Sequence, residues 1–355
     1  MTPKFHSLKI KEVIRETADC VSIAFDVPDD LKSDYSYVSG QYLTLKAMIN
    51  GEDIRRSYSL CSSPFENEWK VAVKEVEKGK FSTYTNRELK AGDELDVMTP
   101  MGNFQVKTNA ENAKSYALFA AGSGITPVLS IIKTILKEEP KSVVSLFYGN
   151  KNTGSIVFRE EIESLKNMHL DDLRITHILS RESLGNKIQK GRIDEEKCGL
   201  LYDAFLAHEG VDEAFLCGPE SMIFAAKKAL ESRGVASENI HFELFTTEGH
   251  EPSPEAKKAA LHDVKSNVIV ILDGDEFPVN LQPGQTILDA SYEAGADLPF
   301  ACKGGVCCTC KAKIIEGSAR MDVNFALDEQ EVADGFILTC QAHPTSDKII
   351  VSFDE

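Results

Sequence analysis

Four cysteines near the C-terminal end of this 355-residue chain have a spacing that supports redox chemistry. Cys302, Cys307 and Cys310 form a C-x4-C-x2-C run, and Cys340 follows 30 positions later. Four thiolates at this spacing are typical ligands of a 2Fe-2S cluster. Two glycines inside the run lack a Cβ, so the backbone can close over the cluster and direct N–H groups at its sulfurs.

A zinc site with four cysteine ligands is the alternative, since it is also a closed site. Zinc sites more often have two C-x2-C pairs, whereas this sequence has only one, Cys307 with Cys310. The 2Fe-2S cluster is therefore favoured over zinc. Cys308 lies between the ligands but does not fit their spacing, and we interpret it as a non-ligand. Cys20, Cys61 and Cys198 are expected to be structural.

Composition excludes several classes of function. The formal net charge is −17, which argues against nucleic-acid binding, and no apolar run is long enough to span a bilayer. With 9 cysteines and no apolar signal region, metal ligation in a reducing compartment is expected, and hence a cytoplasmic protein. Residues 262–355 hold 16 Asp and Glu against 6 Lys and Arg, a net charge of −10 that suits docking on a basic partner surface.

The pattern of apolar and polar residues divides the chain before the cysteine run into two regions of different secondary structure. Residues 1–110 read as short strands broken by glycines, such as 21–25, 42–45 and 70–73, which predicts an antiparallel β-barrel. Over residues 111–245, apolar strands alternate with helices, which predicts a doubly wound parallel α/β sheet. The expected strands are 116–120, 143–148, 175–179 and 213–217. One helix is expected after the first strand, ending at residue 131, and three more are expected at 158–165, 198–208 and 222–233.

The C-terminal part begins after a change in composition. Residues 246–265 are rich in Thr, Glu, Pro and Lys and read as a linker, with a short helix at 256–260. Residues 266–355 are predicted to form an α+β domain. It has strands 268–272 and 277–281 and a helix over 287–295 before the cysteine run.

Two stretches of the barrel region can bind a phosphate-bearing cofactor. In Arg56-Ser57-Tyr58-Ser59, the guanidinium can balance phosphate charge and the tyrosine can stack on a flat ring, although an exposed strand edge is the plainer interpretation. The stretch from Gly79 to Thr83 can begin a helix whose free N–H groups face a pyrophosphate.

A Gly-rich turn opens a helix in the second region, at Gly122-Ser123-Gly124-Ile125-Thr126-Pro127. Gly122 and Gly124 permit a close backbone approach to phosphate at the helix N-terminus, and Pro127 suits the first helical turn. The turn is not a full G-x-G-x-x-G and is a weak signal by itself. Its position directly after an apolar strand strengthens the prediction of a phosphate site.

In this order the motifs resemble those of the ferredoxin–NADP reductase superfamily, in the subgroup with a C-terminal plant-type ferredoxin domain. The resemblance covers essentially the whole chain. It implies an FAD-binding barrel, an NADP-binding doubly wound domain and a ferredoxin-like β-grasp domain with the 2Fe-2S cluster. Electrons are then expected to pass from NADPH to FAD, to the cluster and to a separate oxygenase.

The resemblance also implies the residues of the flavin site. The family's R-x-Y-S motif places Arg56 on the flavin phosphate, Tyr58 against the isoalloxazine and Ser59 near its N5. The family's G-x-x-S segment matches the stretch after Gly79 and implies the FAD pyrophosphate site. The FAD-binding residues expected on this basis are Arg56, Ser57, Tyr58, Ser59, Lys80, Phe81, Ser82 and Thr83.

The pyridine-nucleotide site follows from the same resemblance. The nucleotide loop is expected to use Gly122, Gly124, Thr126 and Pro127, and the NADPH 2′-phosphate is expected on Ser180 and Arg181. An acidic residue, Glu182, adjoins this pair, and acidic residues here are typical of members that use NADH. NADPH is favoured.

Three residues are expected to be catalytic: Ser59, Cys217 and Glu243. Cys217, in a C-G-P motif, corresponds to the family's cysteine beside the nicotinamide; a buried small hydrophobe is the alternative. Glu243 and Phe245 correspond to an acidic residue and an aromatic near the flavin. An edge strand with one Glu pointing outward is the alternative for this pair.

Within the superfamily, the chain is most similar to the reductase components of phenylacetyl-CoA epoxidase systems, which act in phenylacetate degradation. The shared segments are 178–182, 191–194, 241–245 and 302–306. The resemblance implies a di-iron oxygenase as partner, possibly an aryl-CoA epoxidase, docking at the acidic ferredoxin end. Two alternatives stay open: an NADH- and FMN-using reductase of a Rieske dioxygenase, like phthalate dioxygenase reductase, and a non-catalytic electron-carrier ferredoxin.

Overall fold

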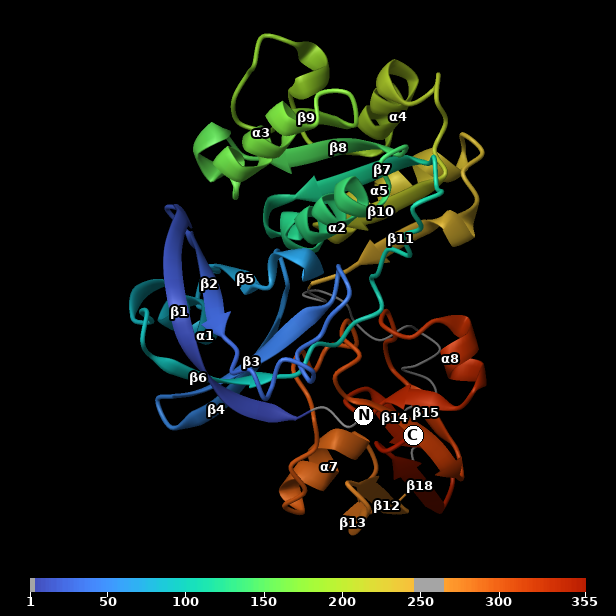
Figure 1. Ribbon diagram of the computed structural model, residues 1–355. Helices are drawn as coiled ribbons and strands as arrows, with labels where there is room; N and C mark the ends of the chain where they lie inside the picture. The colour runs from blue at the N-terminus through green and yellow to red at the C-terminus, as the bar shows by residue number, and fades with distance from the viewer. Residues whose placement is uncertain (1–3, 246–264) are drawn as a thin grey trace.

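The computed structural model describes residues 4–245 and 265–355 and arranges them as three domains, each built on its own sheet (Figure 1). The short helix expected at 256–260, and nearly all of the expected linker 246–265, lie outside the described residues. Within the described residues, no helix is long and apolar enough to cross a membrane.

The barrel domain is a six-stranded antiparallel sheet in the order β4-β3-β6-β1-β2-β5. Its strands are β1 (Phe5–Thr17), β2 (Cys20–Asp26), β3 (Tyr42–Ile49), β4 (Glu52–Ser59), β5 (Trp69–Lys74) and β6 (Glu94–Met98), and one helix, α1 (Lys80–Arg87), packs beside β5. A bridge between Leu60 and Val71 brings the two edges of the sheet together. The antiparallel barrel predicted from the sequence is confirmed.

The second domain, here the parallel-sheet domain, has five parallel strands in the order β11-β10-β7-β8-β9. These are β7 (Ser115–Ala121), β8 (Val143–Asn150), β9 (Leu173–Leu179), β10 (Glu213–Cys217) and β11 (Ile240–Glu243). The helices α2 (Ile125–Glu138) and α3 (Arg159–Met168) cover one face, and α4 (Glu195–Phe205) and α5 (Glu220–Glu231) cover the other. The predicted doubly wound sheet is confirmed.

The helices of this domain differ from the sequence prediction in their boundaries, and α2 continues to Glu138, beyond the expected end at 131. The helix expected over 198–208 begins earlier, at Glu195, because the Asp194 side chain accepts a hydrogen bond from the Lys197 N–H and caps the helix. The helix expected over 222–233 begins directly after Pro219 and ends at Glu231, three residues before Gly234. Both helices keep their apolar faces on the sheet.

The C-terminal domain has a mixed sheet in the order β13-β12-β18-β14-β16, in which β12 and β18 are parallel. Its strands are β12 (Ser266–Leu272), β13 (Asp275–Leu281), β14 (Lys311–Glu316), β16 (Phe336–Leu338) and β18 (Lys348–Ser352), with a separate pair β15 (Ala319–Met321) and β17 (Ala342–Pro344). The helices are α7 (Ile287–Glu293) and α8 (Glu329–Ala333). This is the α+β arrangement predicted from the sequence.

Candidate functional site

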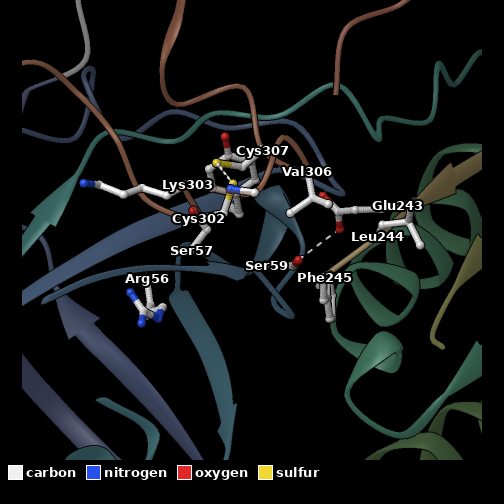
Figure 2. A pocket seen from close by; sticks show the side chains of 12 residues that line it. Arg56, Ser57, Ser59, Glu243, Leu244, Phe245, Cys302, Lys303, Val306 and Cys307 are labelled. Carbon is white, nitrogen blue, oxygen red and sulfur yellow. Dashed lines mark hydrogen bonds between the residues drawn. The ribbon is translucent and has the colours of Figure 1, made fainter. Parts of the chain in front are cut away.

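A cavity of about 410 Å³ lies where the three domains meet (Figure 2). The barrel domain, the end of β11 and the cysteine loop, defined here as residues 297–310, each contribute part of its wall. The lining residues are Tyr42, Arg56, Ser57, Ser59, Glu243, Leu244, Phe245, Cys302, Lys303, Gly304, Val306 and Cys307. Seven residues that the sequence analysis took from separate motifs thus share one cavity: Arg56, Ser57, Ser59, Glu243, Phe245, Cys302 and Cys307.

The antiparallel pair β3–β4 presents the barrel side of this cavity. Tyr42 lies opposite Ser59 and Thr44 opposite Ser57, and the hydroxyls of that second pair are 3.1 Å apart. Because side chains alternate along a strand, Tyr58 shares a face of β4 with Arg56, and its ring lies 5.8 Å from that of Phe81. Tyr58 itself is not among the lining residues of the cavity, although it lies between the two serines that are.

Arg56 offers an uncompensated positive charge beside the cavity. It is exposed and donates to the Arg55 carbonyl oxygen at 2.7 Å. Among the described residues it forms no ion pair with a carboxylate. Its guanidinium is therefore available to an anionic ligand such as a phosphate.

The three residues expected to be catalytic lie next to one another. The Ser59 hydroxyl donates to the Glu243 carboxylate at 3.2 Å, and Cys217 lies opposite Glu243 in the parallel pairing of β10 with β11. Glu243 keeps some accessible surface on the cavity, but protein surrounds its carboxyl, and this burial raises its pKa to about 8. Burial raises the pKa of the Cys217 thiol well above its usual value, so this cysteine stays neutral.

The four predicted ligand cysteines come together at the cysteine loop. The Cys307 thiol lies 3.1 Å from the Cys302 sulfur, and the Cys340 thiol contacts the sulfurs of Cys302 and Cys310. Hydrogen bonds from neighbouring thiols and from the Gly304 N–H lower the pKa of Cys302. Among the described residues, no three Cys, His, Asp or Glu side chains converge as one bound metal ion requires. Together the four thiols suit a two-iron cluster that has two thiolates on each iron.

The backbone of the loop explains one of its glycines. Gly305 has φ +73°, and a Cβ there would lie 2.8 Å from the Val323 carbonyl oxygen. The Phe325 N–H donates to the Gly305 carbonyl oxygen at 2.9 Å and fixes this close approach. A side chain at this position would push the loop away from the segment that closes over it.

The segment expected to bind a pyrophosphate forms the first turn of α1: Lys80, Phe81, Ser82 and Thr83. Its side chains are already engaged. Lys80 pairs with Glu52 at 2.6 Å, Phe81 lies in the barrel core, and the Ser82 hydroxyl donates to the Gly79 carbonyl oxygen at 3.2 Å. The groups left for a phosphate are the backbone N–H groups of the first turn.

The Gly-rich loop lies at the carboxyl ends of β7 and β10, where the strand order of the sheet reverses. This is the position at which open α/β sheets bind ligands. Gly122 has φ +55° and open space around it. A Cβ on Gly124 would lie 2.1 Å from the Cys217 carbonyl oxygen, so Gly124 is needed for packing against β10. Thr126 and Pro127 are buried in α2.

The residues expected at the 2′-phosphate follow β9. The N–H groups of Ser180 and Arg181 donate to the carbonyl oxygens of Asn150 and Lys151, and the Arg181 side chain is exposed. The Glu182 carboxylate accepts hydrogen bonds from the Thr153 N–H at 2.7 Å and hydroxyl at 2.9 Å. These two bonds lower the pKa of Glu182. Glu182 is therefore occupied by its own domain, whereas Arg181 is exposed.

Sequence reasoning missed two barrel residues that contact the cysteine loop. The Tyr42 hydroxyl lies 3.1 Å from the Thr309 hydroxyl and 3.3 Å from the Cys308 sulfur, which supports Cys308 as a non-ligand. Arg55 donates to the Asp297 carboxylate at 2.6 Å. Tyr42 begins a strand of ordinary apolar pattern and Arg55 adjoins the more conspicuous Arg56, so no sequence signal separates either from structural residues.

The three cysteines expected to be structural are buried in the cores of the first two domains: Cys20, Cys61 and Cys198. Burial raises the pKa of Cys20 and of Cys198 to about 12. Their thiols are therefore protonated and behave as small apolar side chains, as predicted.

Three protein-family models match consecutive parts of the chain. An oxidoreductase FAD-binding domain matches residues 7–106, an oxidoreductase NAD-binding domain matches 118–228, and a 2Fe-2S iron-sulfur cluster binding domain matches 270–345. The matches follow the three sheets in order. They confirm FAD and a 2Fe-2S cluster as cofactors and leave open which pyridine nucleotide the second domain prefers.

Curated relatives match over nearly their whole length. The chain is 42% identical to one component of the 1,2-phenylacetyl-CoA epoxidase of Escherichia coli (strain K12), over 99% of this chain and 98% of the relative. It is 33% identical to the ferredoxin reductase component of the 3-ketosteroid-9-alpha-monooxygenase of Rhodococcus rhodochrous, over 98% and 96%. The solved structure of phthalate dioxygenase reductase aligns with a TM-score of 0.60 over 98% of both chains at 22% identity, which shows a shared fold.

Proposed function

Because this chain belongs to the family of FAD- and NAD-binding reductases with a C-terminal 2Fe-2S ferredoxin domain, we propose that it moves electrons from NADPH to a di-iron oxygenase. It is an NAD(P)H-dependent FAD oxidoreductase of the ferredoxin reductase type and the reductase component of a multicomponent oxygenase. A plain electron carrier would have no use for the FAD-binding domain. We assign residues 1–110 to FAD, 111–245 to the pyridine nucleotide and 266–355 to the cluster.

One observation carries the proposal: residues of the flavin motif and two cluster ligands line the same cavity (Figure 2). When bound, FAD accepts a hydride and releases electrons singly, which suits a one-electron cluster. Arg56 would hold the flavin phosphate, Tyr58 would stack on the ring and Ser59 would hydrogen-bond beside it. Cys302 and Cys307 stand on the opposite wall, so the two cofactors would be neighbours.

The catalytic part of the proposal concerns the group beside the cavity. Glu243 is held by Ser59 and has a pKa of about 8, so its carboxyl carries a proton at neutral pH. A protonated carboxyl donates a hydrogen bond without adding negative charge beside a ring that gains electrons. Cys217, kept neutral behind it, would pack beside the nicotinamide.

The choice of NADPH rests on the pair Arg181 and Glu182. An NADH site typically uses a free acidic side chain on the ribose hydroxyls, whereas an arginine suits the 2′-phosphate of NADP. Here Thr153 occupies the acidic side chain, and the arginine is exposed. The guanidinium can therefore bind a phosphate in two-point fashion.

The partner part of the proposal is a di-iron epoxidase that acts on an aryl-CoA thioester. It is supported by the 42% identity with a component of the 1,2-phenylacetyl-CoA epoxidase. The net charge of −10 over residues 262–355 favours docking on a basic surface of that oxygenase. We place this exchange in the cytoplasm, where the 9 cysteines, all free in the described residues, would stay reduced.

The test is reconstitution. The purified protein should show flavin and cluster absorbance, and with NADPH it should support turnover by the oxygenase components of a phenylacetyl-CoA epoxidase. Raising the salt from about 0.05 M to 0.5 M shortens the Debye length to a few ångströms and should slow coupled turnover more than direct ferricyanide reduction. Support of a Rieske dioxygenase and of no di-iron oxygenase would overturn the partner assignment.

A further inference from the structure

Two side chains of the barrel domain reach into the C-terminal domain at the cysteine loop. The first is Arg55 on β4, which is 2% exposed. It donates to the Asp297 carboxylate at 2.6 Å and to the Leu298 carbonyl oxygen at 3.3 Å. Its guanidinium carbon also lies 4.5 Å from the centre of the Phe300 ring. One buried cation therefore holds the beginning of the loop, just before the first cluster ligand, by three kinds of contact.

The second is Tyr42, the first residue of β3, which is 4% exposed. Its hydroxyl contacts Cys308 and Thr309, which lie between the ligands Cys307 and Cys310. Backbone hydrogen bonds with Met101 in both directions fix the tyrosine, at 2.8 and 3.0 Å. The tyrosine is thus held in place by its backbone, and its hydroxyl contacts the C-terminal end of the cysteine loop.

The same strand pair carries the two residues that contact the cysteine loop and the two serines that line the cavity. Arg55 and Tyr42 come from the antiparallel pair that also carries Ser57 and Ser59 to the cavity. Arg55 contacts the loop before Cys302, and Tyr42 contacts it after Cys307. Cys302 and Cys307 are the two ligands that line this cavity. The strands that present the flavin side therefore also fix the distance to the cluster side.

We infer that Tyr42 and Arg55 form a clamp that holds the cysteine loop against the flavin site and so sets the rate of electron transfer from flavin to cluster. The inference rests on the proposed function. Both are positioning residues: one electron leaves the flavin and enters the cluster, and neither side chain is oxidised, reduced or deprotonated. Small displacements of reacting groups have large effects on rate, so loosening either end should slow this step.

Two variants test the clamp from opposite sides. Asp297→Asn removes the acceptor charge on the C-terminal domain and leaves Arg55 its second partner, Asp53, at 2.9 Å. The Asp297 side chain is 68% exposed, so this variant should fold. Tyr42→Phe removes the hydroxyl and keeps the buried ring. Glu316→Gln is the matched control, because it removes one negative charge from an exposed pair with Lys348 in the same domain.

The first readout does not depend on turnover. Hydrogen–deuterium exchange of residues 297–309 should rise in Asp297→Asn and Tyr42→Phe and stay unchanged in Glu316→Gln. The second readout is rapid mixing with NADPH, in which flavin reduction in Asp297→Asn should keep its rate while cluster reduction slows about tenfold, because a small displacement of the reacting groups lowers the rate.

The outcomes separate the clamp from the proposed function. If both cofactors are bound but exchange and cluster reduction match the control, the clamp is wrong and the reductase assignment stands. If flavin reduction slows as much as cluster reduction, the two residues are merely structural, and the clamp is again wrong. If the wild-type protein binds no flavin or no cluster, the proposed function itself fails.

Discussion

The Ser59 hydroxyl donates to the Glu243 carboxylate at 3.2 Å, so the last residues of β4 and β11 join the barrel to the parallel sheet by a side-chain hydrogen bond. Ser59 lies opposite Tyr42, which in turn contacts the cysteine loop. Three domains thus meet within a few side chains. Protonation of the Glu243 carboxyl should therefore affect both the stability of the fold and the binding of a ligand in the cavity.

Replacement of Glu243 by Gln should change how stability depends on pH. Burial raises the pKa of this carboxyl from 4.5 to about 8, so the folded protein holds the proton more tightly than the unfolded chain. The resulting stabilisation is fully present below pH 4.5 and is lost as the pH rises to about 8. The variant has no such proton.

The measurement is the unfolding midpoint of the wild type and of Glu243→Gln across this pH range. The wild type should lose stability relative to the variant as the pH rises, and the two curves should run parallel above the window. Glu316→Gln, an exposed carboxyl, should follow the wild type throughout. Parallel curves for Glu243→Gln across the whole range would show that Glu243 has an ordinary pKa.

Replacement of Tyr58 by Ala should weaken FAD binding roughly tenfold, because a stacking ring is lost. The ring packs on Phe81 at 5.8 Å, which holds it beside the start of α1. Flavin content per chain and the rate of ferricyanide reduction by NADPH measure the effect, and Tyr58→Phe should behave as the wild type. A full flavin load with an unchanged rate in Tyr58→Ala would refute the stacking assignment.

Replacement of Arg181 by Ala should raise KM for NADPH about tenfold or more and leave KM for NADH unchanged, since the proposed contact of the guanidinium is with the 2′-phosphate alone. The matched control is Arg174→Ala, which removes a charge from the opposite end of β9. Equal losses with both nucleotides, or a wild-type preference for NADH, would contradict the NADPH assignment.

Cys340→Ser should abolish cluster absorbance, whereas Cys308→Ser should retain it. Cys340 contacts two other ligand sulfurs, while the nearest polar partner of Cys308 is the Tyr42 hydroxyl at 3.3 Å. Iron content and the visible spectrum of each purified variant provide the test. Loss of the cluster in Cys308→Ser, with survival in Cys307→Ser, would mean that the ligand set is wrong.

Periodicity predicted the three domains well, because their apolar patterns are local. The alternating strands of the barrel and the β–α order of the parallel sheet need no knowledge of distant contacts. The bounds of β1 could not be predicted, because only 3 of its 13 residues are buried and its sequence therefore lacks a clear apolar alternation. Its place in the sheet depends on pairing with β2 and β6, which a local pattern does not reveal.

The candidate site divides in the same way. Motif residues such as Arg56 and Cys302 could be found because short spacings identify them. Tyr42 and Arg55 could not, because their partners are more than 240 positions away in the sequence. Gly124 was predicted to admit a phosphate, whereas its packing on Cys217 depends on a strand pairing that a local pattern cannot show.

The central claim is that electrons pass from the flavin site to the cluster across the shared cavity. Rapid anaerobic mixing of the purified protein with NADPH, followed at one flavin wavelength and one cluster wavelength, tests it most directly. The flavin should be reduced first and the cluster after it, and in Cys340→Ser the flavin phase should remain alone. Reduction of the cluster in protein stripped of flavin, or a cluster that stays oxidised beside a reduced flavin, would contradict the account.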